Sequence, residues 1–180
     1  GSHSLNIKNP DFQEYLILPR VKKFDEAAEI NIEVYNKVKE ELKKQDKNFN
    51  GTRNIEGAWT TVLSDAEILP LLRKVVERIS KERSSEIRIG VDVAGNKLWN
   101  GRRYEYKNFS KVQQKRNLNK DEQIQFIDKI IKNNELYYVE DPLHENDFDG
   151  FQKLIRSDCL ICGDDLIATN PKRLEEAKGK

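Results

Sequence analysis

The sequence has no hydrophobic run that could cross a membrane, almost no net charge and few cysteines. No apolar stretch approaches the ~18–20 residues that a bilayer requires, so we expect no membrane partner. The chain has 32 Lys and Arg against 31 Asp and Glu, a net charge of +1. This balance argues against a strongly basic nucleic-acid binder. The two cysteines form no disulfide framework, which favours a reducing, cytoplasmic compartment.

Length and composition predict one domain with a modest core. The chain has 180 residues and 37% hydrophobic residues, and a domain commonly has roughly 150 residues. Gly1-Ser2-His3, without an initiator Met, is interpreted as an expression-tag remnant, which leaves residues 4–180 as the domain. We therefore expect the natural protein to be longer than this chain.

Hydrophobic periodicity predicts alternating strands and helices in the second half of the chain. Predicted strands cover residues 12–18, 87–93, 136–139 and 159–162. Predicted helices cover 24–42, 64–80, 119–131 and 147–156, and one more begins at 170–171. Asn100-Gly101 between aromatic flanks predicts a hairpin over 98–107. Crossovers long enough for parallel pairing indicate an α/β sheet or barrel.

A carboxylate follows each of three predicted strands. These acids are Asp92, Glu140 (followed by Asp141) and Asp164. In α/β barrels the active site is built at the carboxyl ends of the strands. Three carboxylates that meet there repel one another unless a cation holds them, and Mg²⁺ prefers such oxygen ligands. The alternative, that these acids are ordinary loop or N-cap residues, stays open from the pattern alone.

Several ordered motifs lie along the chain. They read Ile-Gly-Val-Asp-Val-Ala at 89–94, Tyr-Val-Glu-Asp-Pro-Leu at 138–143, Cys-Gly-Asp-Asp-Leu at 162–166 and Ala-Thr-Asn-Pro at 168–171. Upstream motifs are Asp-Phe-Gln-Glu-Tyr-Leu-Ile-Leu-Pro at 11–19, residues 33–37 and Ile-Glu-Gly-Ala-Trp at 55–59. In this order the motifs resemble those of the enolase (phosphopyruvate hydratase) family. The resemblance implies an enolase-type (β/α) barrel, similar to a TIM barrel, of which residues 4–180 are the first part.

The resemblance also implies an activity and its residues. The activity is the Mg²⁺-dependent, reversible dehydration of 2-phosphoglycerate to phosphoenolpyruvate in glycolysis and gluconeogenesis, by a homo-oligomer when intact. By position, Asp92, Glu140 and Asp164 match the metal ligands. Glu56 matches the acid that assists departure of the hydroxide, Glu14 its carboxylate partner, and Gln13 a substrate-binding residue.

Some residues depart from the family pattern and leave alternatives open. Ile55 stands where the family has an acid, and Gly95 and Asn96 stand where it usually has Ala and Ser. A non-catalytic enolase-like paralogue and a general divalent-ion module are the alternatives. Glu14 could also be a solvent-facing charge on an edge strand.

Other conspicuous residues are interpreted as structural. His144 is expected to be a solvated or capping loop residue, and Cys159 and Cys162 to be core residues on opposite faces of a strand rather than a zinc pair. The basic cluster 111–116 is expected to be a surface loop, with no aromatic platform for nucleic acid.

The pattern also predicts how the chain behaves by itself. We expect Asp92, Glu140 and Asp164 to converge at one end of a parallel strand array. Four or five strands fall short of the eight that close a barrel, so the open edges should promote self-association. No lysine matches the family's base, so the 180-residue chain should not turn over 2-phosphoglycerate.

Overall fold

The computed structural model describes residues 9–108 and 117–179. Its main sheet has four strands in the order β1-β2-β5-β6. The strands are β1 (Glu14–Pro19), β2 (Ile87–Asp92), β5 (Tyr138–Glu140) and β6 (Leu160–Cys162). All four predicted strands are present, and β2, β5 and β6 are parallel, as the crossovers predicted. β1 instead runs antiparallel to β2, a direction that the local sequence pattern does not encode.

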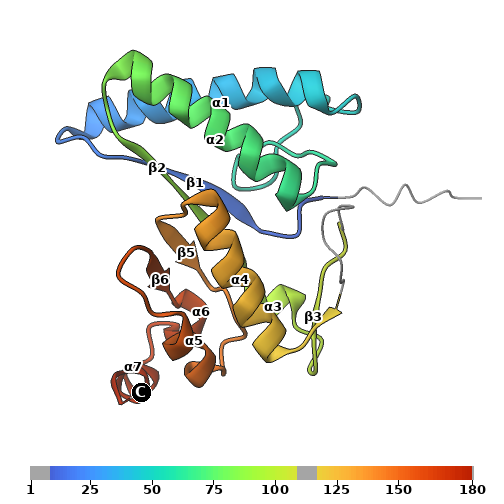
Figure 1. The fold of residues 1–180 in the computed structure, drawn as a ribbon, viewed down its shortest axis with the longest axis vertical. Helices are drawn as coiled ribbons and strands as arrows, with labels where there is room; N and C mark the ends of the chain where they lie inside the picture. The colour runs from blue at the N-terminus through green and yellow to red at the C-terminus, as the bar shows by residue number, and fades with distance from the viewer. Residues whose placement is uncertain (1–8, 109–116, 180) are drawn as a thin grey trace, which may run out of the picture.

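Helices connect the strands and cover the sheet. α1 (Phe24–Gln45) and α2 (Asp65–Arg83) lie side by side at one end of the molecule, next to β1 and β2 (Figure 1). α4 (Lys120–Asn134) and α5 (Phe148–Leu154) form the crossovers between the parallel strands. Shorter helices are α3 (Gly95–Leu98), α6 (Asp164–Ile167) and α7 (Pro171–Lys178).

The helix starts follow the capping signals of the sequence. Ser64 precedes α2 in a capping box with Glu67, and Asn119 precedes α4 in a capping box with Glu122. Asn170 caps α7, with Pro171 in its first position. Side-chain acceptors at these positions satisfy backbone N–H groups that have no partner inside the helix. These boundaries could therefore be predicted from local chemistry.

The predicted hairpin over residues 98–107 is wrong in its pairing. A tight turn is present, since the Asn100 amide donates to the Arg103 carbonyl at 3.0 Å and Gly101 has φ +95°. However, α3 reaches Leu98, which leaves only one bridge, between Trp99 and Tyr104, to flank the turn. β3 (Tyr104–Glu105) pairs with β4 (Asn117–Leu118) instead.

The core lies between the sheet and the apolar faces of α1, α2 and α4. The apolar residues of α2 that repeat with helical spacing are all buried: Ile68, Leu71, Leu72, Val75, Val76 and Ile79. From α1 and α4 the buried side chains include Ile30, Val34, Ile127 and Ile131, which belong to the same cluster as Val91 and Val139 of the sheet. Each Å² of apolar surface that is buried contributes about 25 cal/mol to the stability of the fold, so this packing is its main source.

The described sheet is a partial barrel. It has four strands, whereas a closed barrel of this kind has about eight. β1 and β6 are its two edge strands in the described residues. Within the same residues, none of the helices combines the length and apolar character that crossing a bilayer requires.

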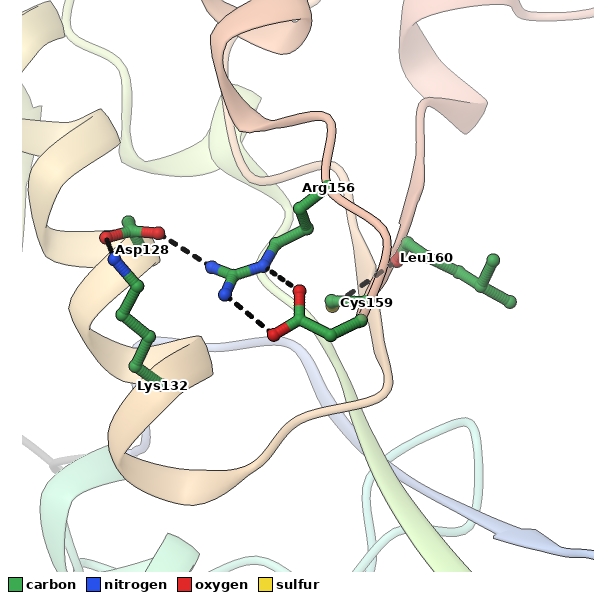
Figure 2. A network of polar contacts seen from close by, with 6 residues as sticks. Asp128, Lys132, Arg156, Cys159 and Leu160 are labelled. Carbon is green, nitrogen blue, oxygen red and sulfur yellow. Dashed lines mark hydrogen bonds and ion pairs between the residues drawn. The ribbon is translucent and has the colours of Figure 1, made fainter.

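An arginine connects α4 to the segment before β6 (Figure 2). The Arg156 guanidinium donates to Asp128 of α4 at 2.7 Å and binds Asp158 through two nitrogens. Asp128 also pairs with Lys132 at 2.6 Å. The Arg156 side chain is 17% exposed but its bidentate partner Asp158 is 65% exposed, so the contact is specific in geometry and still screened by water. It fixes the chain that leads into Cys159 and β6.

Candidate active site

Three carboxylate residues lie side by side in one row on neighbouring strands, at the end of the sheet where β2 and β5 finish. Glu14 of β1 is the register partner of Asp92 of β2, and Asp92 is the register partner of Glu140 of β5. Glu14 begins its strand, whereas Asp92 and Glu140 end theirs. The antiparallel direction of β1 therefore brings its first residue to the edge where the parallel strands end.

Glu140 and Asp164 meet in a group that could hold a metal ion. One carboxylate oxygen from each of Glu140, Asp141 and Asp164 lies within 4.8 Å of the others. The Tyr138 hydroxyl donates to Glu140 at 2.9 Å and orients that carboxylate. Asp164 begins α6, two residues after β6 ends. Oxygen donors of this kind fit Mg²⁺.

Asp92 lies on the neighbouring strand and is not a member of this group. Its Oδ1 accepts from the Ala94 amide at 2.9 Å, and its side chain is buried. Burial raises the pKa of Asp92, and the nearby Glu140 charge raises it further, against the lowering effect of the Ala94 hydrogen bond. Asp92 and Glu140 therefore repel each other when both are charged, and a cation between them would reduce this repulsion. Its assignment as a metal ligand stays a prediction.

Sequence reasoning missed Asp141. Burial raises its pKa to about 6, and both of its oxygens accept from the Asp165 amide, at 3.1–3.2 Å. Asp141 has φ +40°, so the chain turns sharply directly after β5 and sends two consecutive acids to the same place. The pair Glu140-Asp141 is visible in the sequence, but the strand alternation would place only one of the two at the site.

Glu14 and Glu56 form a carboxylate pair. A hydrogen bond with Glu56 raises the pKa of Glu14 to about 7, with burial and the charges of Glu56, Asp92 and Glu140 as further causes. Glu56 comes from an exposed turn between α1 and α2. The contact excludes the reading of Glu14 as a charge that faces only solvent, and it keeps a proton on the pair near neutral pH.

Gln13 lines a cavity of about 510 Å³ beside this pair. The cavity is also lined by Glu14, Tyr35, Trp59 and Lys97, with apolar side chains from α1 and α2 behind them. The Lys97 ammonium donates to the Gln13 side-chain oxygen. Lys97 also lowers the pKa of Asp92 against the larger effect of burial. The site therefore combines acids, an amide and a cation at one mouth.

Comparison with known proteins decides the family. The family model for the enolase C-terminal TIM barrel domain matches residues 1–180. The chain belongs to this family. The match includes Gly1-Ser2-His3, whose origin as a tag remnant stays a prediction.

Enolases of several organisms are among the similar curated proteins. The enolase of Pyrobaculum aerophilum is 41% identical over 179 residues, which cover 98% of this chain and 41% of that protein. The enolase of Archaeoglobus fulgidus is 35% identical over 166 residues, 91% of this chain and 39% of that protein. That of Methanothermobacter thermautotrophicus is 36% identical over 173 residues, with coverage of 93% and 40%. The chain thus spans about two fifths of the length of these relatives.

Both positions at which this enolase-family chain departs from the usual Ala and Ser make contacts with the segments after β5 and β6. The Asn96 amide donates to Glu145 at 3.0 Å and to Asp165 at 2.9 Å, so it bridges two carboxylates. Gly95 donates its amide to the Asp141 carbonyl at 2.8 Å. The two residues tie the chain after β2 to the loops after β5 and β6.

We expect Gly95→Ala to destabilise the fold by about 1–3 kcal/mol, the usual cost of overpacking. A Cβ at this position would lie 2.7 Å from the Leu143 carbonyl carbon and 2.9 Å from the Asp141 oxygen, both backbone atoms that cannot move alone. Chemical denaturation measures the effect. Gly179→Ala is the control, because its Cβ would have no neighbour closer than 3.5 Å. Equal stability of the two variants would contradict the tight approach.

The structural roles predicted for His144, Cys159 and Cys162 can be compared with where these residues lie. His144 lies in a loop, where its Nδ1 accepts from the Asn146 amide and its ring lies 5.7 Å from the Trp99 ring, which agrees with its loop assignment. Cys159 is buried, and burial raises the pKa of its thiol to about 11. Cys162 is only half-buried, beside the acids, so its placement in the core is only partly right. The basic cluster 111–116 lies outside the described residues.

Proposed function

We propose that the full-length protein carrying this chain is a hydro-lyase that interconverts 2-phosphoglycerate and phosphoenolpyruvate. The observation that carries the proposal is the meeting of two carboxylate sets at one sheet edge. The Glu14–Glu56 pair lies at one end of the row, and the group around Glu140 lies at the other. Membership of the enolase family supports the same reaction.

Glu56 acts in this proposal as the acid that protonates the departing hydroxide. An acid with this role must hold its proton near neutral pH, and a neighbouring carboxylate is one way to achieve that. The hydrogen bond between Glu14 and Glu56 supports the pairing of the two carboxylates. The division of roles, with Glu56 as the acid and Glu14 as its partner, is what the family resemblance implies. Gln13, at the mouth of the adjacent cavity, binds substrate.

Glu140, Asp164 and Asp92 are the residues that would hold Mg²⁺. Asp92 is preferred over Asp141 because both Asp141 oxygens already accept from the Asp165 amide, whereas one Asp92 oxygen accepts from Ala94. The bound ion supplies positive charge, which stabilises the negative charge that develops when a proton leaves the carbon beside a carboxylate. Burial is the main cause of the raised pKa values of Asp92 and Asp141, and the charges of the neighbouring acids raise both further, an effect that a cation would oppose.

The cellular setting belongs to the same proposal. We place the protein in the cytoplasm, in glycolysis and gluconeogenesis, as a homo-oligomer. Two free thiols on or beside a strand support a reducing compartment. The open edge of β1 leaves room for further strands of the barrel.

The direct test is turnover by the full-length protein. With 2-phosphoglycerate and Mg²⁺, the ultraviolet absorbance of phosphoenolpyruvate should rise, and a chelator should abolish the rise until Mg²⁺ is restored. A folded full-length protein that produces no phosphoenolpyruvate at saturating Mg²⁺ would overturn the proposal.

We expect Glu140→Gln, Asp164→Asn and Asp92→Asn each to weaken Mg²⁺ binding by more than tenfold in calorimetric titration. Each change removes an anionic oxygen that the ion requires, and even outer-shell changes commonly cost 10–100-fold. Glu82→Gln, at the exposed ion pair with Arg78 on α2, is the matched control and should bind normally. Asp141→Asn decides between the two candidate third ligands: loss with this variant and retention with Asp92→Asn would reverse our assignment.

A further inference from the structure

The Glu56 turn is fastened to α1 at two points. The Tyr35 hydroxyl of α1 donates to the Gly57 carbonyl at 2.6 Å. In the other direction, the Trp59 indole nitrogen donates to the Tyr35 carbonyl at 3.0 Å. The two rings stack with centroids 4.5 Å apart. Tyr35 therefore contacts Gly57 through its hydroxyl and Trp59 through its carbonyl and its ring.

The turn also has its own internal support. The Asn54 side-chain oxygen accepts from the amides of Glu56 and Ala58, at 3.0 and 2.9 Å. Gly57 has φ +86°, a conformation that favours glycine. These bonds define the shape of the turn, but they are local and do not set where the turn lies relative to β1. The contacts with α1 connect the turn to the rest of the fold and so help to set that position.

Trp59 is the anchor of this attachment. Phe49 packs edge-on against it at 6.0 Å, and Lys39 lies 4.8 Å above its ring, while Arg53 lies 5.8 Å away. Aromatic stacking and cation–π contacts of this kind are attractive beyond the burial of the rings themselves. The anchor thus holds the end of the turn while the Tyr35 hydroxyl holds its middle.

We infer that Tyr35 is a positioning residue whose hydroxyl holds the Gly57 carbonyl and thereby keeps Glu56 against Glu14. The expected effect on catalysis rests on the proposed function, whereas the attachment of the turn by Tyr35 does not depend on it. A displacement of about 1 Å in a reacting group can reduce a rate by up to ~10²-fold. One hydroxyl on α1, 21 residues before Glu56 in sequence, would therefore control an acid that it does not touch.

Tyr35→Phe removes the hydroxyl and leaves the ring stack with Trp59. Amide hydrogen exchange at Gly57 and Ala58 should accelerate about tenfold, because one hydrogen bond to the turn is lost. In the full-length protein, kcat should fall about tenfold, with KM for 2-phosphoglycerate and Mg²⁺ affinity unchanged. Tyr104→Phe is the matched control: its hydroxyl accepts from the His144 amide at 2.9 Å in another part of the chain, and both readouts should stay normal.

The outcomes separate the inference from the proposed function. Normal exchange in Tyr35→Phe would overturn the fastening itself. Accelerated exchange with normal kcat, in a protein that Glu56→Gln inactivates, would overturn the positioning role. A wild-type protein without turnover would remove the proposed function, and the exchange measurement would still decide whether Tyr35 holds the turn.

Discussion

Glu56→Gln should lower kcat of the full-length protein by about 10²–10⁴-fold, the usual contribution of a general acid or base. Glutamine keeps the size and polarity of the side chain but has no acidic proton to give to a departing hydroxide. The side chain is on an exposed turn, so the fold should tolerate the change. The measurement is the initial rate of phosphoenolpyruvate formation at saturating 2-phosphoglycerate and Mg²⁺.

Binding of Mg²⁺ separates this effect from damage to the metal site. Glu56 is not part of the Glu140, Asp141 and Asp164 group, so its loss should leave Mg²⁺ affinity within about twofold. Glu82→Gln, which removes an exposed carboxylate paired with Arg78 on α2, is the control and should keep full activity. A Glu56→Gln protein with normal kcat would assign the proton donor to another residue.

The strand-end carboxylates could be predicted because parallel strands share an end. Asp92 and Glu140 each follow a short apolar run, and parallel pairing then places them in register without any further information. The capping boxes before α2 and α4 are equally local signals. These features depend on a few neighbouring residues, which is why the pattern alone identifies them.

The remaining features depend on contacts that are distant in sequence. α1 and α2 lie between β1 and β2 in the sequence. A connection of that length permits either parallel or antiparallel pairing of the two strands, so the observed antiparallel pairing could not be predicted from it. Tyr35 reaches Gly57 across 22 positions, and nothing near either residue indicates the bond. Asp141 joins the acid group through a positive φ that a non-glycine residue rarely adopts. The family resemblance supplied Glu14 and Glu56, which local patterns alone would have left as ordinary acids.

Asp65, at the start of α2, supports β1 and the residue before Gln13. Its Oδ1 accepts from the Phe12 amide at 3.1 Å and from the Tyr15 hydroxyl at 2.5 Å, and the residue is almost fully buried. Its Oδ2 has no hydrogen-bond partner among the described residues. Burial raises the pKa of Asp65 to about 6, although the Tyr15 and Phe12 bonds oppose this. The carboxylate thus fixes both residues that flank Gln13 and Glu14, at an electrostatic cost.

That cost makes the stability of the fold depend on pH. The folded-state pKa of Asp65 lies above its ordinary value of 3.8, so the folded state binds the proton more tightly than the unfolded state. The contribution of Asp65 to the free energy of unfolding should therefore be highest below about pH 4 and fall as the pH rises through about 6. Two pKa units correspond to about 3 kcal/mol. Asp11, which interacts with Asp65 and whose pKa is also raised by burial, contributes in the same direction.

Asp65→Asn should remove this dependence, whereas Asp65→Ala should destabilise the fold by about 2–5 kcal/mol. Asparagine keeps an oxygen for Phe12 and Tyr15 but carries no charge, so urea denaturation between pH 4 and 6 should give a flatter profile than the wild type. Alanine leaves both donors buried without an acceptor, at about 1–3 kcal/mol each. Asp11→Asn is the control that isolates the Asp65 contribution. If Asp65→Asn follows the wild-type profile, another group titrates, and the raised pKa of Asp65 is not what couples the support of β1 to pH.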